Sequence, residues 1–252
     1  MAERATRMLI YKAWLETRAR FLAGAALLTA LVTFTVVGGP ETVREYALAH
    51  PASGLTYGEY IWLQLHSGYS QAVWIFSALI LGNGGLPRER AAGTAAHTLS
   101  LPVRRFQVLL TRSAVCVAEL GILALIPAIL LSTLSPLGGE RYPFGQSLLF
   151  SVTTVGGGLV FLGVGALLPH FFEGAYTAAA VGFAVAGAWF FVGEIPAMRW
   201  LNVFDLMSGA GYLNPGTLLF ESGFPWLALG LSTLAAAAML GSAAVLAEAQ
   251  DF

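Results

Sequence analysis

The chain has 252 residues, of which 57% are hydrophobic and only 11% are charged, with a formal net charge of −1. Soluble globular domains have about 45–50% apolar and about 25% charged residues, so this composition and the mean hydropathy of +0.72 exclude a soluble domain. The chain is predicted to be an integral membrane protein, and we expect no nucleic-acid partner.

Residues 1–20, before the first apolar run, are charged and helix-forming. Apolar and basic side chains fall broadly on opposite sides of the helix that they would form. Tyr11 and Trp14 are typical of the membrane interface. We predict an amphipathic interfacial helix here, with an ordinary solvated tail as the alternative. The run that follows is longer than the apolar core of a signal peptide and lacks a convincing cleavage site, so we expect it to be retained.

Six apolar runs each approach or exceed the roughly 20 residues that a membrane-spanning helix needs. They are continuous and rich in Leu, Ala, Gly and Phe, whereas strands of a membrane barrel alternate apolar and polar residues. We therefore predict an all-α integral membrane protein, a single domain over residues 1–252 with six transmembrane helices. The predicted spans are Phe21–Gly39, Tyr69–Leu86, Val108–Leu134, Ser147–Pro169, Ala175–Val192 and Trp226–Ala247.

The basic residues are unevenly distributed between the two predicted sides of the membrane. Ten of the 13 Lys and Arg residues lie before the first span, between the second and third spans, or just inside the third. Arg44, Arg141 and Arg199 lie on the other side. Because positive loops stay inside, both termini and residues 86–107 are predicted to be cytosolic.

Two outer segments are predicted to be partly helical. Residues 41–49 favour a short helix that ends before Pro51. Residues 193–225 are apolar but repeatedly broken by proline and glycine, so they cannot form one helix. For this second segment we predict a re-entrant hairpin of two short helices, Ala197–Met207 and Pro215–Glu221, that dips into the outer leaflet. A loop folded on the surface is the alternative.

Residues 86–107 form the longest charged break on the cytosolic side. Within them, Arg88–Thr98 favour a short helix, and Pro102 prevents this helix from continuing into the third span. A short helix joined to two spans can transmit force from a soluble partner into the membrane. The alternative is a basic connection that only sets the topology.

Glu119 lies near the middle of the third span, where a charge costs roughly 2.5–3.5 kcal/mol on insertion scales. We therefore expect it to face protein or a watery cavity, either as a pathway or gate residue or as a buried hydrogen bond between helices. Arg112 lies seven residues earlier on the same helix face, too far away for a relaxed direct pair.

Catalytic and metal sites have little support in the sequence. The single cysteine, Cys116, can form no intramolecular disulfide, and the four histidines are not spaced as metal ligands. No GxxxxGK[ST] phosphate loop is present, so we expect neither nucleotide binding nor enzymatic activity in this chain. An intramembrane hydrolase would need Ser208 and His170 together, yet the predicted topology places them towards opposite faces of the membrane.

The run RERAAGTAAHTLSLPVRRFQVLL resembles the E-x-x-x-G-T and L-S-L-P-V-x-R segment after the second span of ABC-2 type permeases. KAWLETRARFL, at Lys12–Leu22, is similar to the amphipathic elbow helix of that family, and the six-span plan also agrees. The residues that carry the first match are Glu89, Gly93, Thr94, Leu99, Ser100, Leu101, Pro102, Val103 and Arg105.

The resemblance implies the permease subunit of an ABC transporter, an exporter in a prokaryotic cytoplasmic (inner) membrane. It implies a dimer of permease subunits, either a homodimer or a pair with a related chain, docked to two cytosolic ATPases that bind ATP and Mg²⁺. No cofactor is expected in this chain. Residues 86–107 would contain the coupling helix, with a contact face formed by Arg88, Glu89, Arg90, Gly93, Thr94 and His97.

A pathway between two such subunits would be lined by the first, second and fifth spans. Phe34, Trp74 and Phe183 are candidate wall residues and Glu119 a candidate gate. Mostly apolar walls favour an amphipathic or lipidic substrate over a small hydrated ion. The alternative function is a non-transporting membrane scaffold or assembly factor, which recruits a cytosolic partner without an ATP-driven cycle.

Overall fold

The computed structural model describes residues 2–50, 54–85, 89, 93, 105–172, 174–221 and 223–249. Within these ranges the regular structure is entirely helical, with eight α-helices. Five helices of the described chain are long and apolar enough to cross a membrane. Helix length and hydropathy therefore indicate a multi-pass membrane protein.

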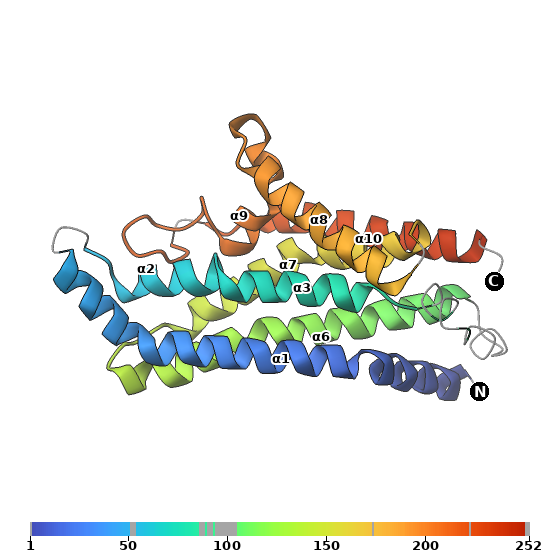
Figure 1. The fold of residues 1–252 in the computed structure, drawn as a ribbon, viewed down its shortest axis with the longest axis horizontal. Coiled ribbons are helices and arrows are strands. Elements are labelled where there is room, and N and C mark those ends of the chain that lie inside the picture. The colour runs from blue at the N-terminus through green and yellow to red at the C-terminus, as the bar shows by residue number, and fades with distance from the viewer. Residues whose placement is uncertain are drawn as a thin grey trace.

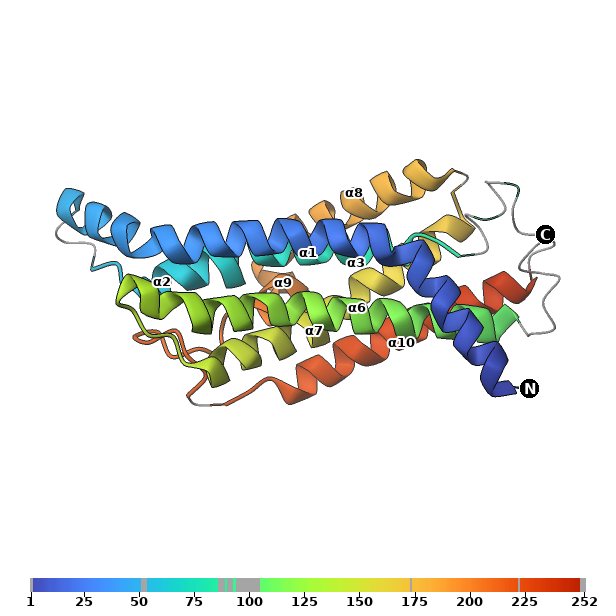
Figure 2. The same ribbon diagram turned by 90° about the horizontal axis from the view of Figure 1, so that it is seen from below.

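The long helices run roughly along one axis, and both termini lie at the same end of the bundle (Figures 1 and 2). The C-terminal end of α3 and the N-terminal end of α6 lie at this end too. The elements are α1 (Ala2–Ala49), α2 (Tyr57–Ile61), a π-helix (Trp62–His66), α3 (Tyr69–Gly82), α6 (Arg105–Leu134), a 3-10 helix (Ser135–Gly138), α7 (Phe144–Leu167), a 3-10 helix (Leu168–His170), α8 (Ala175–Gly193), a 3-10 helix (Pro196–Leu201), α9 (Val203–Ser208) and α10 (Trp226–Ala249).

Five of the predicted spans correspond to the long helices α1, α6, α7, α8 and α10. The second prediction, Tyr69–Leu86, corresponds to α3, which has only 14 residues and is not among the five. A turn at Ser67 and Gly68 separates α3 from the π-helix before it. A Cβ at Gly68 would lie 2.5 Å from the carbonyl oxygen of Leu63, so this close turn requires glycine.

Residues 2–49 form one helix and not three pieces. The predicted elbow at 1–20, the first span and the predicted helix at 41–49 are all parts of α1, which has 48 residues and contains Pro40. Figure 2 shows this helix changing direction near its N-terminal end. Its inward face there recurs about once per helical turn, through the buried residues Leu9, Ala13, Thr17 and Phe21.

The core lies where α1, α3, α6 and α7 meet, and it contains Leu28, Trp74, Leu120 and Phe161. Glycine allows α3 and α7 to approach closely, because a Cβ at Gly165 would lie 2.6 Å from a carbonyl oxygen of α3. Of the five long helices, α8 and α10 have the smallest buried share.

The outer segment 193–225 differs from its predicted form. The predicted helix Ala197–Met207 is divided at Asn202, whose side-chain oxygen accepts hydrogen bonds from the first amides of α9 and so begins a new helix. The predicted helix Pro215–Glu221 is not helical. Asn214 closes a turn there by backbone hydrogen bonds with Leu218 and Leu219.

Three side chains of the bundle bind carbonyl oxygens of α9. Gln71 Nε2 donates to Phe204 at 2.8 Å, Thr153 Oγ1 to Met207 at 3.0 Å, and Trp62 Nε1 to Ser208 at 2.9 Å. The last carbonyls of a helix have no partner within it and need one in apolar surroundings. These bonds anchor the outer segment to α3, α7 and the π-helix.

We expect Thr153→Val to lower the free energy of unfolding by about 1–2 kcal/mol, because it leaves the Met207 carbonyl without its buried donor. Thermal unfolding in detergent measures the change. Thr133→Val is the matched control, since the Thr133 hydroxyl is exposed and bonds only within α6. Equal losses in the two variants would contradict the anchoring role.

Candidate functional site

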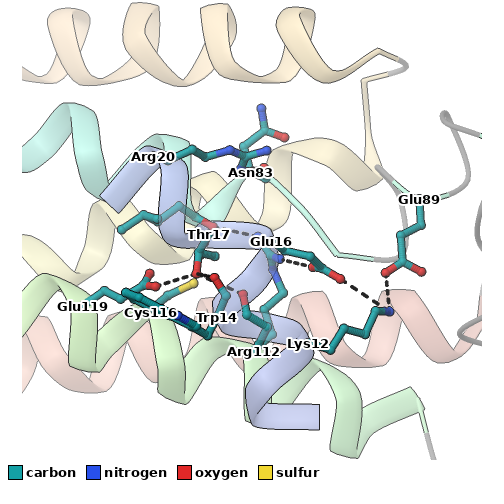
Figure 3. A network of polar contacts seen from close by, with 12 residues as sticks. Lys12, Trp14, Glu16, Thr17, Arg20, Asn83, Glu89, Arg112, Cys116 and Glu119 are labelled. Carbon is teal, nitrogen blue, oxygen red and sulfur yellow. Dashed lines mark hydrogen bonds and ion pairs between the residues drawn. The ribbon is translucent and has the colours of Figure 1, made fainter. Parts of the chain in front are cut away.

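A cluster of polar side chains joins α1, α3 and α6 near the end of the bundle that carries both termini (Figure 3). We call it the inner polar cluster. Its charged members come from segments that are far apart in the sequence, and two of them, Arg112 and Glu119, are buried. The cluster consists of Lys12, Glu16, Thr17, Arg20, Asn83, Glu89, Arg112, Cys116 and Glu119.

Lys12 connects α1 to the segment that follows α3. Its ammonium nitrogen lies 2.7 Å from the Glu89 carboxylate and 3.5 Å from the Glu16 carboxylate, one turn further along α1. The Glu89 side chain is only 14% exposed, so this ion pair is shielded better than an ordinary surface pair. Glu89 is thereby held against α1.

Arg112 extends the cluster to α6. Its Nη1 donates to Glu16 at 2.9 Å, and its Nη2 donates to the Leu81 carbonyl oxygen of α3, also at 2.9 Å. A Cβ at Gly84 would lie 2.0 Å from Nη2 of Arg112, so a side chain at this position would displace the guanidinium from its present place. One buried guanidinium therefore connects three helices.

Arg20 binds the C-terminal end of α3 from the other side. Its Nη1 donates to the carbonyl oxygens of Ile80 at 2.8 Å and Asn83 at 2.9 Å. The last carbonyls of a helix carry partial negative charge and favour a cation. Arginines of α1 and α6 thus replace the water that would otherwise solvate the end of α3.

Glu119 faces protein, as predicted, and is 2% exposed. The hydroxyl of Thr17, itself fully buried, donates to Glu119 Oε1. The other carboxyl oxygen of Glu119 is buried without a hydrogen bond from the described residues. Arg112 and Glu119 do not pair with each other; each contacts α1 separately, as their spacing predicted.

The predicted coupling face is described at two of its six residues. Glu89 contacts Lys12, whereas Gly93 is exposed with φ of +71°. A right-handed helix needs negative φ, so the predicted helix over residues 88–98 cannot continue through Gly93. The other predicted contact residues, Arg88, Arg90, Thr94 and His97, lie outside the described residues.

The candidate pathway residues have different surroundings. Phe34 is 79% exposed on α1, and Phe183 of α8 packs on Phe76 of α3 with ring centroids 4.6 Å apart. Trp74 is buried in the core, where its indole nitrogen donates to the Leu120 carbonyl at 3.0 Å. As wall residues between subunits, Phe34 and Phe183 are better placed than Trp74. The pathway assignment stays a prediction.

Sequence reasoning missed the α1 part of the cluster. Lys12, Glu16 and Arg20 are four residues apart and share one face of the helix. That spacing was the available signal, but it also suits a solvated helix face. Only the packing of α1 against α3 and α6 shows that these charges point into the bundle.

Within the described part of the chain, no group of three or more His, Cys, Asp or Glu side chains could hold a metal ion.

The helical fold and the five long apolar helices of the described chain define an all-helical, multi-pass membrane protein. No protein-family model matches the chain, and no curated protein matches it.

We expect Glu119→Gln to change the free energy of unfolding by less than about 1 kcal/mol, because the amide oxygen still accepts the Thr17 hydrogen bond. Glu119→Ala removes this contact with α1 and leaves a cavity, so we expect a loss of about 1–3 kcal/mol. Thermal unfolding in detergent compares the two. An equally large loss in both variants would mean that the carboxyl group itself is needed for the fold.

Proposed function

We propose that the chain is the membrane-spanning permease subunit of an ATP-driven exporter of the ABC-2 type. It would couple ATP hydrolysis by a separate cytosolic ATPase to movement of a substrate across the membrane. The motif in residues 89–105 supports this proposal, together with the attachment of Glu89 to the helices of the bundle.

In this proposal the chain crosses the membrane six times. The second crossing combines α2, the π-helix and α3, which together with the turn at Ser67 and Gly68 extend over residues 57–82. At about 1.5 Å per residue these 26 residues extend roughly 35–40 Å, enough for a hydrocarbon core about 30 Å thick. An even number of crossings agrees with two termini at one end of the bundle (Figure 1).

The single observation that carries the coupling proposal is the chain of contacts from Glu89 to Lys12, Glu16 and Arg112. A partner that displaces the segment around Glu89 would pull on α1 through Lys12 and on α6 through Arg112. The N-terminal part of α1, with exposed Met8 and Tyr11, would lie at the inner interface beside it.

The proposal requires at least two partners. A cytosolic ATP-binding cassette ATPase would contact the segment 86–107 and bind ATP and Mg²⁺. A second permease subunit, the same chain or a related one, would pack against this chain. Exposed aromatic residues such as Phe34 suit such a contact within the membrane.

Affinity purification from native membranes in mild detergent, followed by mass spectrometry, tests the proposal. We expect a soluble protein with a phosphate-binding loop in about one copy per permease. We also expect the permease to change its ATPase rate. Folded, abundant permease without such a partner would contradict the exporter and favour the non-transporting scaffold, for which a pull-down should recover a partner lacking nucleotide-binding motifs.

A further inference from the structure

A cavity of about 810 Å³ lies between the outer segment and the long helices. Residues 199–203, 205, 206 and 210–212 form one side, and side chains of α7, α8 and α10 form the other. This volume lies in the range of about 300–1,000 Å³ typical of small-molecule sites. The inner polar cluster contributes no residue to it.

The walls of this outer cavity are held by specific bonds. The Trp189 indole nitrogen of α8 donates to the Leu201 carbonyl oxygen at 2.9 Å. Asn202 caps α9, and three side chains of the bundle bind α9 carbonyls as described above. These hydrogen bonds fix the cavity walls in place, so the cavity is a defined part of the fold.

The chemistry of the cavity walls is amphipathic. Trp200, Tyr212, Leu231 and Met239 provide aromatic and aliphatic surface. Two charged residues, Arg199 and Asp205, also line the cavity, with their side chains 3.9 Å apart. This distance is long for an ion pair, and the Arg199 side chain is 78% exposed, so the pair is weak and open to a ligand.

We propose that the outer cavity binds a zwitterionic phospholipid of the surrounding outer leaflet. An alkyl chain would fill the space between α9 and α10, with the lipid phosphate at Arg199 and the lipid ammonium at Asp205. Guanidinium groups suit phosphate well, and the adjacent carboxylate disfavours a headgroup that carries only negative charge.

The bilayer itself provides a route into the cavity. Leu231 lines the cavity and is 60% exposed, on the same helix as Leu227 and Leu234, which are exposed as well. In a membrane this apolar face of α10 contacts lipid, so an alkyl chain can enter sideways. The inference is independent of the exporter proposal, because it requires no ATPase and no transport.

Native mass spectrometry of the full-length chain in mild detergent, with added phosphatidylethanolamine or phosphatidylglycerol, tests this site. We expect the zwitterionic phosphatidylethanolamine to be retained at least tenfold better. Ala235→Phe places a ring on the cavity wall and should reduce retention about tenfold or more. Ala237→Phe, an exposed position of the same helix that does not line the cavity, should leave it unchanged.

Substitutions of the two residues proposed to bind the lipid headgroup provide a second test, which does not depend on filling the cavity. Arg199→Gln should reduce retention of phosphatidylethanolamine about tenfold, whereas Arg141→Gln, an exposed residue outside the cavity, should not. Asp205→Asn should remove the preference over phosphatidylglycerol. Equal retention by Ala235→Phe and the unchanged protein, or equal retention of the two lipids by the unchanged protein, would overturn the proposal.

Discussion

Arg112→Met is expected to lower the free energy of unfolding by about 3 kcal/mol. The substitution leaves Glu16 without its cation and the Leu81 carbonyl without its donor at the junction of α1, α3 and α6. Removing one partner of a buried ion pair costs about 3–5 kcal/mol. We expect the lower end, because the Glu16 side chain is 31% exposed and water can partly solvate it.

Thermal unfolding in detergent measures this loss, and Arg18→Met is the control. Arg18 lies on the exposed side of the same part of α1, so its loss should cost less than about 0.5 kcal/mol. Because Glu16 and Arg112 interact directly, Glu16→Gln combined with Arg112→Met should destabilise less than the sum of the two single variants. Additive losses would mean that the ion pair does not hold the junction.

If the chain is the proposed permease, Glu89→Lys is expected to reduce its stimulation of the partner ATPase about tenfold or more, with little change in thermal stability. The substitution replaces an ion pair of 2.7 Å by two like charges and so releases the segment from α1. Although the Glu89 side chain is only 14% exposed, the Lys12 side chain is 34% exposed and can turn towards water, so the folding cost should stay at about 1 kcal/mol. The readout is the ATPase rate of the purified complex in proteoliposomes.

A charge exchange separates loss of this contact from other effects of lysine. Lys12→Glu combined with Glu89→Lys should restore part of the stimulation. Recovery should be incomplete, because a carboxylate at position 12 would also face Glu16, now 3.5 Å from the Lys12 ammonium. Glu45→Lys, an exposed residue in the last turns of α1, should have no effect. Normal stimulation in Glu89→Lys would remove Glu89 from the coupling mechanism.

Some of the architecture could be predicted from local features of the sequence. Five apolar runs became the long helices α1, α6, α7, α8 and α10, because a continuous apolar run of this length has few alternatives to a spanning helix. The buried position of Glu119 was also predictable, since an isolated carboxyl group in a span must face protein or water.

Other predictions failed because the same residue type can end a helix in one place and be accommodated within a helix in another. Pro40 does not end α1, although proline usually breaks a helix. Asn202 divides a run that reads as one helix, because its side chain competes for the backbone amides. Gly93 adopts a left-handed conformation inside a run of good helix formers.

The sequence by itself determined that the chain belongs in a membrane, that it is helical and that its basic residues are unequally distributed, because these features depend on composition and on the order of residues along the chain. Only the tertiary structure decided the partners of Lys12, Arg20, Arg112 and Glu119, because each contact joins segments distant in the chain. The outer cavity has the same origin. Its walls come from α7, α8, α9, α10 and the 3-10 helix before α9, and no local pattern encodes the space between them.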